Sequence, residues 1–225
     1  MNNLDCQRIK KMVLKPEQRA KLDPSDDNLF YNFPRFVTHV DDMFLQQLTD
    51  LYSERLKPNT KILDLMSSWV SHLPNIQFYH VEGHGMNEEE LRKNRRLNHY
   101  FIQNLNQNPK LPFLDQEFDA VINCVSVQYL QYPEAIFSEI YRILKPGGIV
   151  IISFSNRMFF EKAIALWRDN TEEGRIELVK NYFTSVKGFT QPEVISKVNP
   201  AYKILQSLGF PGSDPFYAVI SYRSE

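Results

Sequence analysis

The stretch K-I-L-D-L-M-S-S-W-V-S-H-L-P, residues 61–74, decides the fold, because it joins an apolar strand to a turn. The letters I-L-D-L make a short strand that carries the carboxylate of Asp64 near its end. In ligand-binding α/β sheets such a strand runs into a glycine-rich turn, which lets a ligand approach the backbone. This chain continues instead with M-S-S-W at 66–69. The sequence therefore indicates a ligand-binding sheet whose first turn has been changed.

Strand-like and helix-like segments alternate after this turn. The apolar runs predict strands at 62–65, 76–81, 100–103, 118–125 and 149–154. Capping residues and helical spacing predict helices at 41–56, 87–97, 133–144, 158–169 and 172–184. A late strand is expected in the tail 213–224, paired antiparallel with 192–198. Such alternation predicts an α/β fold with a Rossmann-like, doubly wound and mostly parallel sheet.

Length and composition limit the class of protein. The chain has 225 residues, of which 43% are hydrophobic and 24% charged, enough for one sizeable globular domain. The formal net charge of −1 gives no bulk electrostatic signature of nucleic-acid binding. We therefore expect a single domain over 29–225, preceded by a polar and partly ordered segment at 1–28.

The expected location is the cytoplasm. Two cysteines, Cys6 and Cys124, lie far apart without partners at metal-ligand spacing, so neither a disulfide framework nor a metal site is expected. No apolar run approaches the roughly 20 residues of a membrane-spanning helix. The basic start of the chain lacks an apolar signal region and leaves import into an organelle open. No membrane partner is expected.

The ligand site is expected where the strands end. In open α/β sheets a ligand binds at the carboxyl ends of the strands, near the switch in strand order. That rule selects residues 64–70, 82–87, 103–106 and 123–129. These four stretches are candidates from topology alone.

Residues 111–156 resemble the second half of a class I S-adenosylmethionine-dependent methyltransferase of the type 11 group. The ordered pattern L-P-F-x-D-x-x-F-D-x-V, then a strand, a helix and R-x-L-K-P-G-G, carries this resemblance. The likeness extends over about 60–156 and is similar to a subgroup with a D-L-x-S-S-W first turn and G-x-G-M-N after the second strand. It implies about seven strands, the last antiparallel, with S-adenosyl-L-methionine as cofactor and a small-molecule acceptor.

The resemblance also implies cofactor contacts, with two losses. None of the usual glycines stands in the first turn, and the carboxylate that commonly holds the ribose falls on Gly85. The residue facing the adenine falls on Asn104, whose carboxamide oxygen can accept a hydrogen bond. The flanking glycines suggest a second turn that approaches the ligand closely, and the serine pair can serve a carboxylate at a helix start. The expected cofactor-binding residues are Asp64, Met66, Ser67, Ser68, Gly83, Gly85, Met86, Asn104, Leu105 and Asn123.

An N-terminal lid is expected over this site. The segment F-Y-N-F-P-R-F-V-T-H-V-D-D, residues 30–42, precedes the first strand, and in similar enzymes that region often folds over cofactor and substrate. His39 is the candidate general base, and Arg35 is the candidate for gripping an anionic group. The alternative is that the phenylalanines of the segment dock it on the sheet while Arg35 and His39 make local hydrogen bonds.

Three functional hypotheses remain open. Methyl transfer from S-adenosylmethionine to a small molecule accounts for the ordered motifs. Loss of the glycine turn and of the ribose carboxylate motivates a second hypothesis, a non-catalytic binding or assembly module on the same fold. A nicotinamide-dependent oxidoreductase would require G-x-G-x-x-G after a strand, and M-S-S-W-V-S at 66–71 does not provide it.

Overall fold

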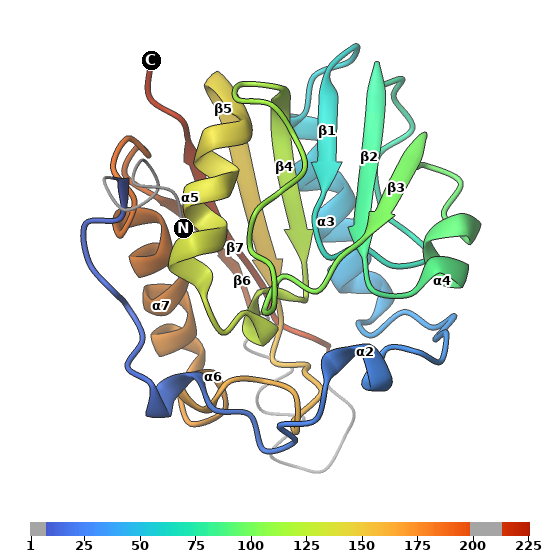
Figure 1. Ribbon diagram of the computed structural model, residues 1–225. Coiled ribbons are helices and arrows are strands. Elements are labelled where there is room, and N and C mark those ends of the chain that lie inside the picture. The colour runs from blue at the N-terminus through green and yellow to red at the C-terminus, as the bar shows by residue number, and fades with distance from the viewer. Residues whose placement is uncertain (1–7, 199–212) are drawn as a thin grey trace.

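The computed structural model describes residues 8–198 and 213–225 of the chain, which form one seven-stranded sheet in the order β3-β2-β1-β4-β5-β7-β6 (Figure 1). Strands β1 to β5 are parallel, β7 is antiparallel to β5, and β6 is antiparallel to β7. This confirms the predicted mostly parallel sheet and its late antiparallel strand. The strands are β1 Lys61–Asp64, β2 His80–Gly85, β3 His99–Ile102, β4 Phe118–Cys124, β5 Leu144–Phe154, β6 Glu193–Lys197 and β7 Phe216–Tyr222.

Helices cover both faces of the sheet. Figure 1 shows α3 behind the strands and α5 and α7 in front of them, while α4 lies beside β3 at the edge of the sheet. The short α2 lies below the carboxyl ends of the strands. The helices are α2 Asp27–Phe30, α3 Asp42–Arg55, α4 Glu88–Lys93, α5 Pro133–Ile143, α6 Ala165–Arg168 and α7 Glu172–Thr184, with short 3₁₀ turns at Glu17–Arg19 and Val127–Tyr129.

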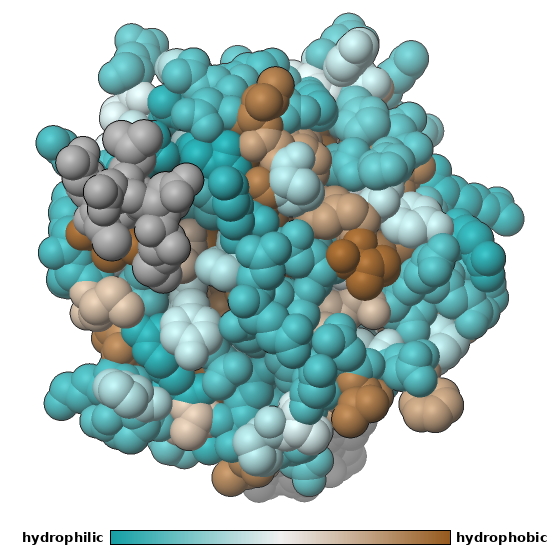
Figure 2. All heavy atoms as spheres, viewed as in Figure 1, coloured by the Kyte–Doolittle hydropathy of each residue, from teal (hydrophilic) through white to brown (hydrophobic). Residues whose placement is uncertain are grey.

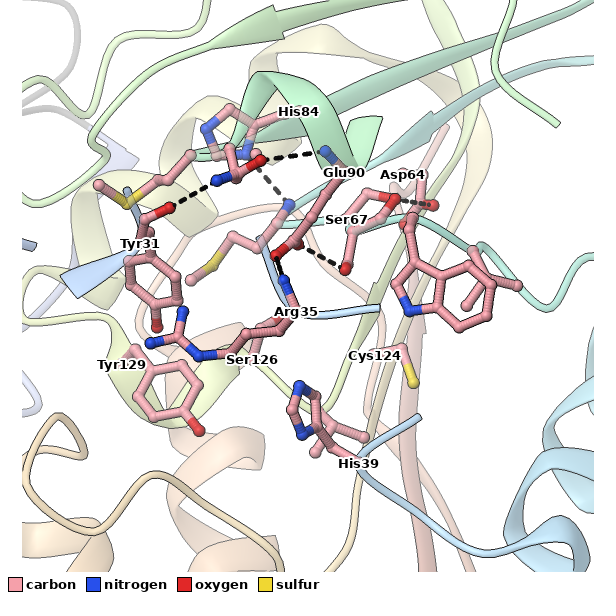
Figure 3. Close-up of a pocket in the computed structure, with 18 of the residues that line it drawn as sticks. Tyr31, Arg35, His39, Asp64, Ser67, His84, Glu90, Cys124, Ser126 and Tyr129 are labelled. Carbon is pink, nitrogen blue, oxygen red and sulfur yellow. Dashed lines mark hydrogen bonds between the residues drawn. The ribbon is translucent and has the colours of Figure 1, made fainter. Parts of the chain in front are cut away.

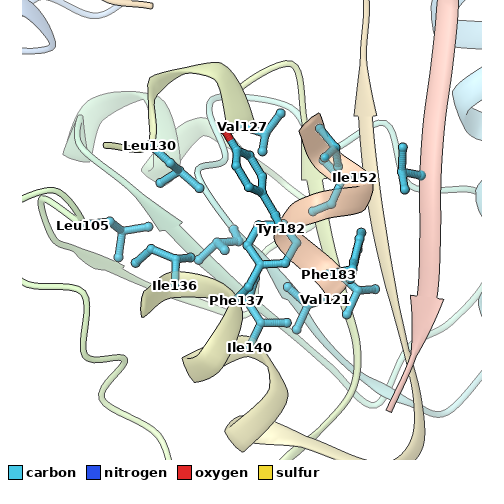
Figure 4. Close-up of a cluster of buried hydrophobic side chains, with 14 of the residues drawn as sticks. Leu105, Val121, Val127, Leu130, Ile136, Phe137, Ile140, Ile152, Tyr182 and Phe183 are labelled. Carbon is cyan, nitrogen blue, oxygen red and sulfur yellow. The ribbon is translucent and has the colours of Figure 1, made fainter. Parts of the chain in front are cut away.

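Each face of the sheet buries its own hydrophobic core. On the front face α5 and α7 pack on the strands, and Phe137 of α5 lies between the rings of Tyr182 and Phe183 at centroid distances of 5.5 and 4.9 Å (Figure 4). On the other face α3 buries Phe44 and Leu48 against β1 and β7. The helical spacing predicted both buried faces correctly, because apolar residues three and four positions apart share one side of a helix.

Several segments differ from the predictions: the helix expected over 87–97 ends at Lys93, and the strand expected from 149 begins at Leu144. The second strand is β2 at 80–85 rather than 76–81. Residues 158–169 form a helix only over α6. The connection between β1 and β2 contains no helix, so no helix begins after the first turn and the serine pair at 67–68 caps none. Parallel strands are usually joined through a helix, and its replacement by an irregular segment changes what the first turn can offer to a ligand.

The N-terminal segment is tied to the domain by buried ion pairs. Arg19 contacts Glu134 at 3.0 Å. Lys162 is completely buried and lies 2.9 Å from Asp23 and 3.5 Å from Asp27. The loop before α6 therefore contributes a buried cation that anchors the start of α2.

The visible surface is mainly hydrophilic, with apolar residues in scattered patches (Figure 2). Single exposed apolar side chains of this kind are normal for globular domains. Across 8–198 and 213–225, the structure contains no helix with the length and apolar character needed to traverse a bilayer.

Candidate functional site

A pocket opens at the carboxyl ends of β1, β2, β3 and β4 and is covered by residues 31–40 (Figure 3). Both candidate catalytic residues, Arg35 and His39, line it from this covering segment, which we call the lid. Eight of the ten expected cofactor-binding residues line the same pocket: Asp64, Met66, Ser67, Ser68, Gly85, Met86, Asn104 and Leu105. The structure therefore brings together residues that lie up to about 70 positions apart in the sequence.

Gly83 and Asn123 are not among the residues that line the pocket. Both stand inside strands: a Cβ at Gly83 would collide with the side chain of Leu97, and Asn123 Nδ2 donates to the Leu65 carbonyl at 3.0 Å. Gly85 lines the pocket from β2, but a Cβ there would lie 2.8 Å from the Ser67 carbonyl oxygen. The two glycines therefore admit neighbouring parts of the chain, and the expected second turn that presses against a ligand is not formed by them.

The first turn has the backbone conformation of a glycine turn without the glycine. Met66 has a φ of 59°, in the left-handed region that costs a non-glycine residue about 1 kcal/mol. The Met66 N–H donates to His84 Nδ1 at 3.0 Å, and the Ser67 N–H donates to the His84 carbonyl at 2.6 Å. Two amides of the turn are thus bound to the chain itself rather than presented to a ligand.

His84 holds the ends of three neighbouring strands together. Its ring is buried in β2, and Nε2 lies 2.9 Å from the Gln103 carbonyl oxygen that follows β3. Burial lowers the pKa of His84 to about 4. The imidazole is therefore neutral at neutral pH, with its proton on Nε2 and its Nδ1 accepting from Met66. His84 is thus a strand residue on which the first turn rests.

The carboxyl group of Asp64 lies beneath the first turn. It is buried and accepts a hydrogen bond from Ser67 Oγ at 2.6 Å. Burial raises the pKa of Asp64 to about 6, although the Ser67 hydroxyl opposes this shift. Ser67 therefore serves Asp64 directly, which is a contact within the chain that the sequence pattern did not indicate.

Side chains from the strand ends hold the lid in place. Glu90 of α4 accepts from the Arg35 N–H at 2.6 Å through one oxygen and from Ser68 Oγ at 2.7 Å through the other. Trp69 Nε1 donates to the Val37 carbonyl at 3.1 Å. Asn87 Nδ2 donates to the Tyr31 carbonyl at 2.8 Å. The lid backbone is thus fixed by residues of the loops after β1 and β2.

Glu90 is a pocket residue that the sequence reasoning missed. Asn87 and Glu90 stand at the spacing of a capping box, in which both side chains bond to the helix start. Asn87 Oδ1 does accept from the Glu90 N–H at 3.0 Å, but the Glu90 carboxylate turns away to the lid and Ser68. The capping pattern therefore indicates where the helix begins. A hydrogen-bond partner of the Glu90 side chain is Arg35, 55 positions earlier, and the pattern does not indicate it.

Replacing Asn87 by aspartate tests the attachment of the lid. Aspartate keeps the oxygen that caps α4 but loses the amide that donates to the lid carbonyls, so we expect the lid to open more easily by about 1–2 kcal/mol. Hydrogen exchange should then be about tenfold faster at the amides of 31–40 and unchanged in α4. Asn98→Asp is the matched control, because Asn98 uses only its oxygen, at 2.7 Å from the Val81 N–H. Equal exchange in both variants would contradict the tether.

The end of β4 provides the opposite wall of the pocket. Val125 has a φ of 49°, which is rare for a β-branched residue. The next residue, Ser126, places a buried hydroxyl at the pocket, and this hydroxyl has no hydrogen-bond partner among the residues described. Burial raises the pKa of the Cys124 thiol to about 12, so Cys124 is no nucleophile at neutral pH. A strained turn and an unsatisfied hydroxyl at one point mark this wall as a place for a ligand.

Arg35 and His39 each lie next to the aromatic ring of Phe159 in the pocket. The Arg35 guanidinium donates to the carbonyls of Phe30 and Phe33 at 3.0 and 3.3 Å, so it does make local hydrogen bonds. Phe33 is 73% exposed, whereas Phe30 packs on Phe159 at 5.2 Å and Phe36 on Trp69 at 6.4 Å, so two of the three phenylalanines do dock the segment. His39 lies at the pocket mouth with its ring 5.0 Å from the centroid of Phe159, and partial burial lowers the pKa of His39. Both residues therefore remain available to a ligand.

Asn104 after β3, the expected adenine-facing residue, already uses part of its hydrogen-bonding capacity within the chain. Asn104 Oδ1 accepts from the Asn106 N–H at 3.0 Å, which leaves one lone pair of this oxygen for a ligand. Leu105, which is buried, and Met86 of the loop after β2 add apolar surface to the lining of the pocket. Within 8–198 and 213–225, no group of three or more histidine, cysteine or carboxylate side chains is arranged to hold a metal ion.

Sequence comparisons identify relatives over part of the chain. Residues 65–152 match a family described as a methyltransferase domain. The demethylmenaquinone methyltransferase of Streptomyces avermitilis is 46% identical over 48 residues, 21% of each protein. A biotin biosynthesis bifunctional protein of Teredinibacter turnerae is 49% identical over 43 residues, 19% of this chain and 8% of that protein. The matched regions span between 8% and 22% of the lengths of the curated relatives.

Solved structures share the fold at low identity. A chain of the complex between the Trm112 methyltransferase activator and a methyltransferase of Haloferax volcanii superposes with a TM-score of 0.57 at 12% identity, covering 82% of this chain and 92% of that one. The phosphoethanolamine N-methyltransferase 2 of Haemonchus contortus, solved with S-adenosyl-L-methionine, gives 0.54 at 17% identity, covering 80% and 52%. Residues 65–152 of this chain therefore match a methyltransferase domain family, and the described residues share the fold of solved methyltransferases.

Proposed function

We propose that this protein binds S-adenosyl-L-methionine in the pocket beneath the lid and transfers its methyl group to a small-molecule acceptor. The observation that carries the proposal is the meeting of four strand ends and one lid around a single pocket, with an unsatisfied Ser126 hydroxyl in its wall. Ligands of open α/β sheets bind at this place. The sequence match over 65–152 agrees with it.

The groups present in the pocket fit this cofactor. Met86 and Leu105 offer apolar surfaces for a flat purine, and Asn104 retains an acceptor for its amino group. Glu90 places a carboxylate between the ends of β1 and β2, where it can accept from hydroxyl groups. The main-chain N–H groups of Met66 and Ser67 donate to His84, so they are not available to bind the cofactor.

The protein's own contribution is alignment and exclusion of water. The cofactor supplies a methyl group that is already activated on a sulfonium, so little acid-base chemistry is required. The lid, held by Glu90, Asn87 and Trp69, covers the pocket and orders both reactants. His39 accepts a proton from an acceptor that carries one.

Ligand-dependent unfolding tests the proposal. At a concentration 100 times its dissociation constant, S-adenosylmethionine or S-adenosylhomocysteine should stabilise the protein by about 2.7 kcal/mol, or about 5–11 °C in melting temperature. Calorimetric titration should confirm the binding, and a nicotinamide dinucleotide is the control ligand, for which no shift is expected. Absence of both shift and heat with the sulfur ligands would contradict the proposal and favour the alternative, a binding or assembly module on the methyltransferase fold.

A further inference from the structure

One side of the pocket carries a cation, an imidazole and aromatic rings around a single side chain, Phe159. The Arg35 Cζ lies 5.4 Å from the Phe159 ring centroid, and the His39 ring lies 5.0 Å from it, edge to face. Tyr129 stacks on the same ring at 5.9 Å with an interplanar angle of 28°. We call these four residues the aromatic wall. Arg35 and His39 come from the lid and Tyr129 from the 3₁₀ turn after β4 (Figure 3), while Phe159 comes from the loop after β5.

The positive charge of Arg35 has no carboxylate partner on this wall. Among the residues that the structure describes, the guanidinium donates only to the carbonyls of Phe30 and Phe33. Glu90 accepts from the Arg35 main-chain N–H, and its second oxygen is held by Ser68. An arginine in a pocket that is satisfied by carbonyls and rings alone retains its capacity to bind an anion.

The imidazole beside it is suited to receive a proton. Partial burial and the positive charge of Arg35 lower the pKa of His39, against an opposing effect of Glu90. His39 is therefore neutral at neutral pH, as a general base must be. Protonated amines, by contrast, would place a second positive charge near Arg35, which is unfavourable in a site partly shielded from water.

We propose that the methyl acceptor is a planar aromatic compound with an acidic hydroxyl group, bound as its oxyanion by Arg35 on the aromatic wall. This inference rests on the proposed methyl transfer and names the chemical class of its acceptor. Tyr129 and Phe159, stacked on each other, both line the pocket and give it an aromatic side against which an aromatic ring can pack. Arg35 stabilises the negative oxygen, and His39 removes the proton.

The chemical balance of the transfer is complete with these groups. The acceptor hydroxyl gives its proton to His39, and its oxygen forms the new bond to the methyl carbon. The carbon–sulfur bond of the donor breaks and leaves its electron pair on sulfur. The product is a neutral aromatic methyl ether, which Arg35 binds less tightly than the oxyanion.

Binding of 4-nitrophenol to the full chain, with and without S-adenosylhomocysteine, tests the inference. The phenol and its phenolate have different absorption spectra, so one titration reports both affinity and ionisation. We expect the bound compound to be more ionised than the free compound at the same pH. It should also bind about tenfold more tightly than 4-nitroanisole, which has the same ring but no ionisable proton.

Two variants separate the charge of Arg35 from its packing. Arg35→Gln should lose about tenfold in affinity for 4-nitrophenol, together with its extra ionisation, while Arg35→Lys should keep most of both. Affinity for 4-nitroanisole should change little in either variant. Unchanged binding of S-adenosylhomocysteine in both would show that the pocket is intact.

Three results would overturn the acceptor class. They are 4-nitrophenol bound as the neutral phenol, equal affinity for 4-nitroanisole, or tighter binding of benzylammonium than of the phenolate. Each is measured on protein that still binds S-adenosylhomocysteine, so failure of this inference is distinguished from failure of the proposed methyl transfer, for which S-adenosylhomocysteine itself would not bind.

Discussion

Gly85→Val is expected to destabilise the protein by about 3 kcal/mol and to lower its affinity for S-adenosylhomocysteine at least about tenfold. A Cβ at Gly85 would lie 2.8 Å from the Ser67 carbonyl oxygen and 3.1 Å from the Leu91 side chain. The first of these neighbours is backbone and belongs to the turn that His84 holds. Because valine suits a strand, the loss would come from this collision rather than from strand propensity. Urea unfolding and calorimetric titration measure the two effects.

Gly83→Val is the matched control on the same strand. Its added atoms meet the Leu97 side chain, which is flexible at its end and lies outside the pocket. We therefore expect Gly83→Val to lower stability without changing ligand affinity in protein that remains folded. If both variants lose stability but neither loses affinity, Gly85 does not position the first turn for a ligand.

The sheet was predictable because its signals are local. The strand Phe118–Cys124 is mostly apolar and buried, and Pro133 stands where a helix begins. The second strand was placed too early because I-Q-F-Y, residues 76–79, has the stronger strand propensity. The actual strand at 80–85 contains two glycines and is selected by pairing with β1 and β3. Strand propensity is weak compared with such tertiary pairing.

The site was less predictable because its contacts join distant segments. The strand-end rule placed eight of the ten expected cofactor residues at the pocket. It could not show that His84 binds the amide of Met66, or that Glu90 reaches the lid 55 positions earlier. The missing glycine turn predicted a rebuilt site, with a lost site as the alternative, but not the means: the structure places a methionine in the left-handed conformation and fixes it with a buried histidine. No short sequence pattern encodes that compensation.

The floor of the pocket contains two buried groups whose titrations oppose each other. Burial raises the pKa of Asp64 from 3.8 to about 6 and lowers the pKa of His84 from 6.5 to about 4. For Asp64 the folded state binds the proton more tightly, so its contribution to stability is complete below pH 3.8 and is lost as the pH rises through about 6. For His84 the unfolded state binds the proton more tightly, so stability is complete above pH 6.5 and is lost as the pH falls through about 4.

Single substitutions should therefore give pH profiles of opposite slope. Each shift corresponds to about 3 kcal/mol, and the two nearly cancel between pH 4 and 6 in the native protein. In Asp64→Asn only His84 of the pair still titrates, so the free energy of unfolding of this variant should fall relative to the native protein as the pH is lowered. In His84→Gln only Asp64 of the pair still titrates, so this variant should gain stability relative to the native protein as the pH is lowered over the same range. Urea unfolding at several pH values measures both differences, and the other titrating groups cancel in the comparison. Parallel profiles for the three proteins would mean that these groups titrate normally, and the neutral imidazole that supports the first turn would have to be abandoned.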